Sequence, residues 1–178
     1  MDSKSYSAYQ HRHNFAVWAA ARAAQRGFTT TEKLREALEA SSIDTFVEHP
    51  CGREDFDDRH RSWCGSICQQ LRSRQVEGAS YGRAAKLVNV YLKSIVVLPD
   101  LSSDVASYVH PPIDRILLQN VARAPEVSTE RSQKLRNTSW TQLSETAYFD
   151  LIAMLKDING DRPFWKIEEY WDVTSNSL

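Results

Sequence analysis

The amino-acid sequence predicts an all-α protein: a single compact helical domain of about six to seven helices. Gly and Pro number only six each among 178 residues, which is few for a chain built from many β-turns. Apolar residues recur three or four positions apart along most of the chain, the spacing that puts them on one helix face. We expect residues 14–178 to form the domain and the polar residues 1–13 to be disordered or loosely attached.

The first expected helix covers residues 14–26 and ends at Gly27, which suits a left-handed helix cap. Its helical spacing places Phe15 and Trp18 together on the face that we expect to be buried. A second helix is expected to begin at Thr29, which forms a capping-box pattern with Glu32, and to end near residue 41. Its apolar positions are Leu34, Ala37 and Leu38.

Residues 42–55 contain Pro, Gly and several acids without a sustained period, and this pattern predicts a loop. A third helix is expected over residues 56–74, and its buried positions are Trp63, Ile67 and Leu71. A fourth is expected between Ser80 and Pro99, with an apolar stripe of Ala84, Leu87, Val88, Tyr91 and Leu92. Its β-branched end, residues 95–98, is expected to stay helical because the sequence offers no partner strands.

A fifth helix is expected to start at Pro111 and Pro112, since proline is well suited to the first turn of a helix. Its inward positions are Ile113, Ile116, Leu117 and Val121. The polar residues 124–139 predict an irregular segment. A sixth helix is expected over residues 143–158, followed by a final aromatic-rich turn or two over residues 163–171.

Charge is distributed unevenly, although the whole chain carries a net charge of only -1. Residues 59–93, which we call the basic hairpin, contain one acid, Glu77, and seven cations: Arg59, Arg61, Arg72, Arg74, Arg83, Lys86 and Lys93. From Glu145 onward there are seven acids and three bases. This asymmetry predicts that the basic hairpin binds DNA or an acidic protein, or that it pairs with the acidic C-terminal region of a second copy.

The segment GASYGRAAKLVNVYLK is followed, 28 residues after Lys86, by Asp114 in HPPIDRILL. Over residues 78–122 the chain resembles the helix-hairpin-helix DNA glycosylases, and most nearly their archaeal 8-oxoguanine glycosylase branch. In place of the usual hairpin signature the chain has Glu77 to Gly82. The resemblance implies a lysine nucleophile, matched by Lys86 or equally by Arg83, and an aspartate, matched by Asp114.

Lys86 and Asp114 also make chemical sense as a reacting pair. Neighbouring cations on the helix of Lys86 lower the pKa of its amine and so increase the neutral, nucleophilic fraction. A nearby carboxylate such as Asp114 can take its proton and stabilise positive charge on a sugar. The alternative role for Asp114 is structural, because an acid in the first turn of a helix complements the helix dipole.

If the chain is such an enzyme, it removes a damaged or modified base, and part of the basic hairpin holds DNA phosphates. The expected phosphate-binding residues are Arg72, Arg74, Arg83 and Lys93. Tyr81 and Trp140, each at the junction of a loop and a helix, are expected to stack on a base. The alternative function is a non-enzymatic helical module that binds nucleic acid or an acidic protein through the basic hairpin.

No cofactor, metal or membrane is expected. The chain contains no Walker loop, dinucleotide fingerprint or zinc-protease motif. His60, Cys64 and Cys68 lie four apart on one helix, a spacing that disfavours a zinc site and favours buried side chains. Three cysteines fit a reducing compartment, and the absence of a long apolar run predicts a soluble, cytoplasmic protein.

Overall fold

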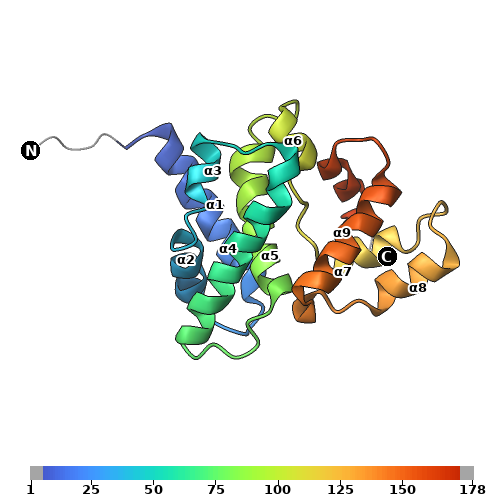
Figure 1. The fold of residues 1–178 in the computed structure, drawn as a ribbon, viewed down its shortest axis with the longest axis horizontal. Helices are drawn as coiled ribbons and strands as arrows, with labels where there is room; N and C mark the ends of the chain where they lie inside the picture. Colours follow the sequence, from blue (N-terminus) through green and yellow to red (C-terminus); the bar gives the residue numbers. More distant parts are fainter. Residues whose placement is uncertain (1–5, 173–178) are drawn as a thin grey trace, which may run out of the picture.

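The computed structural model describes residues 6–172, and Figure 1 shows their helical arrangement. These residues contain no strand, so the predicted all-α class is confirmed. They form nine α-helices, more than the six to seven predicted, together with one π-helical segment, η1, and two 3-10 segments, η2 and η3. The elements are α1 (Ala8–Gln25), α2 (Thr31–Glu39), α3 (Asp44–Glu48), α4 (Arg53–Ser73), α5 (Tyr81–Leu92), η1 (Lys93–Val97), α6 (Asp104–Tyr108), α7 (Arg115–Val121), α8 (Thr129–Asn137), η2 (Trp140–Gln142), α9 (Glu145–Asn159) and η3 (Phe164–Tyr170).

Helix α1 starts earlier than its apolar pattern indicates. Ser7 caps it, and a capping box with Gln10 satisfies two backbone amides that the helix start leaves free. Residues 8–13 therefore belong to the helix and do not form part of a loose arm, whereas residues 1–5 lie outside the described part of the chain. The helix ends at Arg26, which itself adopts the left-handed conformation one residue before Gly27.

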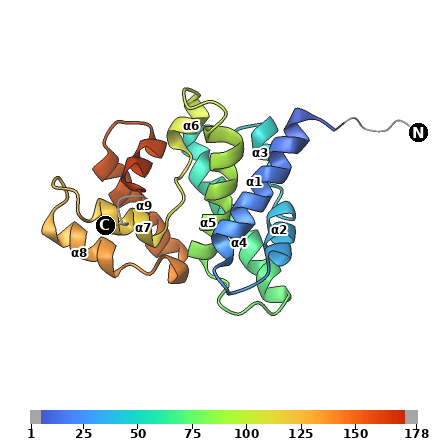
Figure 2. The ribbon, with the colours of Figure 1, turned by 180° about the vertical axis from the view of Figure 1, so that it is seen from behind.

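The buried face of α1 differs from the predicted one. Phe15 and Trp18 are 57% and 60% exposed, so the expectation that they face the core is wrong. The residues that do face it are small: Ala16, Val17, Ala20, Ala21 and Ala24. Helix α1 lies beside α5 and α2 (Figure 2), and small side chains let these helices approach closely. The large rings are therefore left on the solvent side.

Helices α2 and α4 match their predicted apolar stripes, and all six predicted residues are buried. The cap of α2 is Thr30, whose Oγ1 accepts a hydrogen bond from the Lys33 amide at 3.3 Å, and not Thr29. The expected loop between the two helices contains a further short helix, α3, whose Phe46 packs edge-on against Trp63 with ring centroids 5.3 Å apart.

Helix α5 confirms both its predicted start and its apolar stripe. Ser80 caps it, and all five residues of the stripe are buried. The β-branched run continues it as η1, so no strand forms there. Helix α5 contacts α1, α4 and α9 (Figure 1) and thus joins the two halves of the molecule. The described core is one contiguous cluster that extends from Ala16 to Ile167.

In the second half of the chain, the observed helices differ more from those predicted by apolar spacing. The segment predicted to be irregular contains α8, which is capped by Ser128 and buries only Leu135, so it has no apolar stripe by which to recognise it. Helix α6 was also missed. The two prolines precede α7 rather than opening it, because Asp114 is the capping residue. Ile116 is only half-buried, unlike the other three predicted inward residues of this segment.

Candidate functional site

Two residues that the sequence singles out meet in the interior. Lys86 lies in the middle of α5, and Asp114 caps the start of α7. Lys86 Nζ and Asp114 Oδ2 are 3.0 Å apart, and the two residues are only 6% and 4% exposed. The fold therefore brings together the amine and the carboxylate, although 28 residues separate them in the sequence.

Asp114 accepts from three donors. Its Oδ1 accepts from the Leu117 amide at 2.9 Å, which is the capping bond of α7. Its Oδ2 accepts from Lys86 Nζ and from Trp171 Nε1, each at 3.0 Å. The two roles considered for this aspartate, helix start and partner of the amine, are thus filled by the same carboxylate.

The surroundings shift the pKa values of both Lys86 and Asp114. Burial lowers the pKa of the Lys86 ammonium, and the Asp114 carboxylate and the more remote Glu168 oppose this only in part. Burial raises the pKa of the Asp114 carboxyl, but Lys86, the Leu117 amide and Trp171 outweigh it, so that pKa is lowered overall. The pair consists of a stabilised carboxylate and an ammonium that releases its proton more easily than a surface lysine does.

The C-terminal segment covers this pair. Lys93 Nζ on η1 makes an ion pair with Glu168 on η3, and it lies 5.4 Å from the ring centroid of Trp171. Trp171, just beyond η3, donates to Asp114 and is itself 39% exposed. The indole therefore lies between the buried pair and solvent.

The basic hairpin is less cationic in space than in sequence. Four of its seven cations have acidic partners: Arg61 pairs with Asp58 and Glu145, Arg74 with Glu36, Lys86 with Asp114, and Lys93 with Glu168. Within residues 6–172 this leaves three, Arg59, Arg72 and Arg83, without an ion pair. Most of the local charge of +6 is therefore compensated by acids from other segments.

Two of these ion pairs also bear on the predicted self-association. Arg61 with Glu145 and Lys93 with Glu168 join the basic hairpin to the acidic C-terminal region inside one chain. This is the contact that the charge pattern suggested between two copies. Charge complementarity alone therefore gives no reason to expect a dimer.

The expected phosphate-binding residues are dispersed. Arg72 Nη2 donates to the Ala79 carbonyl at 3.4 Å, and Arg74 pairs with Glu36. The Arg83 guanidinium lies 3.9 Å from the centroid of the Phe28 ring. One terminal nitrogen of Arg83, Nη1, is buried without a hydrogen-bond partner.

The expected stacking residues are buried. Tyr81 is 7% exposed, and its hydroxyl lies 3.0 Å from His60 Nδ1. Trp140 is 5% exposed, and part of it lines a cavity of about 400 Å³ that we call the arginine cavity. The residues of this cavity are Arg26, Arg115, Arg136, Asn137, Thr138, Ser139, Trp140 and Thr141.

A buried polar network that was not predicted from the sequence surrounds His60. His60 Nε2 donates to Asn89 Oδ1 at 2.9 Å, while Nδ1 accepts from Tyr81. Asn89 Nδ2 donates to the Tyr148 hydroxyl and to the Pro111 carbonyl, both at 2.9 Å. These bonds fit a neutral imidazole with its proton on Nε2.

The network continues toward the surface. The Tyr148 hydroxyl lies 3.1 Å from His110 Nδ1, and His110 Nε2 lies 3.1 Å from Asp57 Oδ1. Asp57 is half-buried and borders a second cavity, of about 350 Å³. The only sequence signal for this network is a polar residue inside an apolar stripe, such as His60 between Phe56 and Cys64.

The zinc candidates take part in the same packing. Cys64 Sγ lies 3.7 Å from His60 Nδ1, and Cys64 and Cys68 are buried free thiols. No group of three or more metal-ligating side chains comes together among the residues described.

Acidification is expected to destabilise the protein through its two buried histidines. Burial lowers the pKa of His60 to about 3 and also lowers the pKa of His110. Because unfolding lets each imidazole bind a proton near pH 6.5, stability is fully present above that pH and is lost as the pH falls below it. At pH 5.5 the loss from His60 alone is about 1.4 kcal/mol.

Urea unfolding followed by circular dichroism between pH 8 and pH 5 measures this loss. Asp57, whose pKa is lowered by His110, adds its own loss only at lower pH. An unchanged free energy of unfolding between pH 7.5 and pH 5.5 would contradict the burial of these imidazoles.

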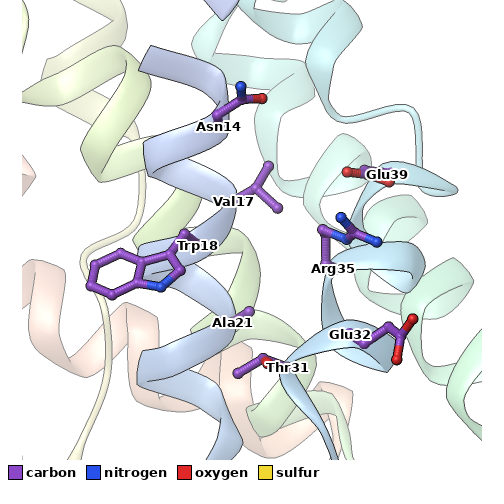
Figure 3. A pocket seen from close by; sticks show the side chains of 8 residues that line it. All are labelled: Asn14, Val17, Trp18, Ala21, Thr31, Glu32, Arg35 and Glu39. Carbon is purple, nitrogen blue, oxygen red and sulfur yellow. The ribbon is translucent and has the colours of Figure 1, made fainter. Parts of the chain in front are cut away.

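A further cavity, of about 530 Å³, lies between helices α1 and α2 (Figure 3). Glu32, Arg35 and Glu39 project from α2, while the indole of Trp18 extends from α1 away from α2. The described residues that line it are of mixed charge and include no cysteine, histidine or lysine.

Comparisons with family models, with curated proteins and with solved structures find no match to this chain. None of its described helices is long and apolar enough to cross a membrane. The fold and the site together define an all-α protein with a buried lysine–aspartate ion pair.

Proposed function

We propose that the protein binds DNA and removes a base, with Lys86 as the nucleophile and Asp114 as its proton acceptor. The observation that carries the proposal is the 3.0 Å contact between Lys86 Nζ and Asp114 Oδ2 in the interior. It supports the lysine–aspartate pairing that the resemblance to DNA glycosylases implies. It also favours Lys86 over Arg83, which lies on Phe28 instead.

The lowered pKa of the Lys86 amine agrees with this role. A buried ion pair contributes little net stability, because the cost of removing both charges from water offsets their attraction. A contribution to stability is therefore not a sufficient reason for this ion pair to be buried in the protein. The lowered pKa of Lys86 increases the fraction of neutral amine, which is the form that attacks carbon.

The proposed reaction starts with transfer of a proton from Lys86 to Asp114. The neutral amine forms a bond to C1′ of the deoxyribose while the bond from C1′ to the base breaks, and the electron pair of that bond leaves with the base. Asp114 gives its proton to the departing base and then takes one from the alkylated amine. The nitrogen lone pair then forms a C1′=N double bond while the bond from C1′ to the ring oxygen O4′ breaks, and O4′ takes the proton from Asp114, which leaves a Schiff base. The reaction requires Trp171 to move off Asp114.

A second candidate function is a non-enzymatic helical module. It is favoured by the three hydrogen bonds that already occupy Asp114 and by the burial of Lys86. In this function the pair only fixes α5 against α7, and no lysine reacts.

Borohydride trapping distinguishes the two functions. The probes are one duplex that contains an abasic site and another that contains 8-oxoguanine. We expect wild-type protein to form a covalent adduct with both, and Lys86→Gln to lose at least about 100-fold of the trapping, as expected when a catalytic group is removed. The control, Lys166→Gln, removes an exposed lysine from η3 and should trap as wild type does.

Peptide mapping of the wild-type adduct identifies the linked lysine even if Lys86→Gln does not fold. An adduct on Lys86 supports the proposal. Linkage to surface lysines in proportion to their exposure, or no adduct with either duplex, would overturn it and leave the helical module.

A further inference from the structure

Three arginines from outside the basic hairpin line one cavity. Arg26 ends α1, Arg115 begins α7 and Arg136 lies in the last turn of α8, yet all three line the arginine cavity. Among residues 6–172 none of them has an ion pair with an acidic side chain, whereas four cations of the basic hairpin do. Three arginines that line one cavity carry like charges, and an anion in the cavity would offset their repulsion.

The remaining lining suits the same kind of ligand. Asn137, Thr138, Ser139 and Thr141 supply amide and hydroxyl groups, and none of the described residues that line the cavity is acidic. A guanidinium group offers two parallel N–H donors, which match two oxygens of a phosphate. The cavity therefore combines charge, donors and space for a phosphate ester.

The position of the cavity connects it to the buried pair. Arg115 directly follows Asp114 in the chain, and Arg26 is close enough to contribute to the lowered pKa of Lys86. The wall formed by Trp140 and Thr141 is held against the start of α5, because Ser80 Oγ donates to the Thr141 carbonyl at 2.7 Å. The cavity therefore adjoins the start of α7, where Asp114 lies, and the start of α5, the helix that carries Lys86.

We infer that the arginine cavity binds a backbone phosphate of a DNA strand and so places the strand next to Lys86 and Asp114. This inference rests on the proposed function, since it names the part of the DNA that the protein holds. It moves the phosphate contacts from the basic hairpin to three arginines outside it.

Binding of a fluorescein-labelled duplex, followed by anisotropy at several salt concentrations, tests the inference. The test variant carries Arg26→Gln, Arg115→Gln and Arg136→Gln together. The control carries Arg12→Gln, Arg35→Gln and Arg59→Gln, three exposed arginines from α1, α2 and α4 that also have no ion pair among the described residues. Both variants lose three positive charges, so only position differs.

We expect the test variant to bind at least about 10-fold more weakly than the control at 0.1 M salt. Its plot of log affinity against log salt should be less steep by about 1 to 2, since each phosphate contact adds roughly 0.9 to that slope. Equal affinities of the two variants, or no binding of duplex by the wild type, would overturn the inference.

Inorganic phosphate and ADP distinguish a DNA site from a site for small phosphates. If either binds the wild type but not the test variant while the duplex does not bind, the cavity is a small-phosphate site and the DNA assignment is wrong. The borohydride experiment tests the proposed enzymatic function independently of the arginine cavity. If duplex binding depends on the three arginines but no Lys86 adduct forms, the phosphate site is supported and the enzymatic function is overturned. If a Lys86 adduct forms but the test and control variants bind duplex equally well, the enzymatic function is supported and the phosphate site is overturned.

Discussion

Replacing Asp114 by Ala is expected to lower the free energy of unfolding by about 3 to 5 kcal/mol, since removing one partner leaves the other charge buried and unpaired. The change removes the partner of Lys86, the capping bond to the Leu117 amide and the acceptor of the Trp171 indole at once. Loss of a helix cap alone costs only about 1 kcal/mol. Urea unfolding of the purified variant measures the loss.

Two further variants separate the ion pair from the cap. The side-chain oxygen of Asn can still accept the hydrogen bond from the Leu117 amide. Asp114→Asn should therefore lower the free energy of unfolding by less than Asp114→Ala does. Adding Lys86→Met to Asp114→Asn removes the unpaired ammonium and should restore part of the stability. Strictly additive effects of the two changes would show that Lys86 and Asp114 are not coupled. In the proposed enzyme Asp114→Asn should also react slowly, whereas in a helical module only its stability changes.

Replacing Gly82 by Ala is expected to have the second large effect. A Cβ atom on Gly82 would lie 1.9 Å from the Trp140 carbonyl oxygen and 3.1 Å from the Leu143 Cβ. The first of these is a backbone atom, and the Gly82 amide also donates to the Leu143 carbonyl at 3.1 Å. The two segments would have to separate, at a cost of about 3 kcal/mol, as in other overpacked sites.

Gly65 on α4 is the matched control. A Cβ there would meet nothing within 4 Å, so Gly65→Ala should stabilise the helix by about 0.5 to 1 kcal/mol. A thermal melt of both variants compares them directly. If Gly82→Ala melts as high as the wild type, helix α5 and residues 140–143 do not approach as closely as the structure places them. A loss would also displace Trp140 and Thr141, and it should weaken binding at the arginine cavity.

Local patterns predicted much of the helical structure. Apolar spacing identified α2, α4 and α5, since each of them buries one continuous stripe, and Ser80 marked the start of α5 correctly. Helix α8 escaped because it buries only Leu135 and therefore carries no stripe to recognise. The face of α1 was predicted wrongly, because hydrophobicity does not say whether a neighbouring helix is close enough to require alanines rather than Phe15 and Trp18.

The sequence by itself determined the all-α class, the start of α5 at Ser80, and the choice of Lys86 and Asp114 as a pair worth testing. Only the tertiary structure decided which charges are free. A count along the chain gave the basic hairpin its positive charge, but acids from distant segments pair with most of it, while Arg26, Arg115 and Arg136 gather at one cavity from three separate helices. Electrostatic interaction depends on distance in space, and sequence separation does not report that distance.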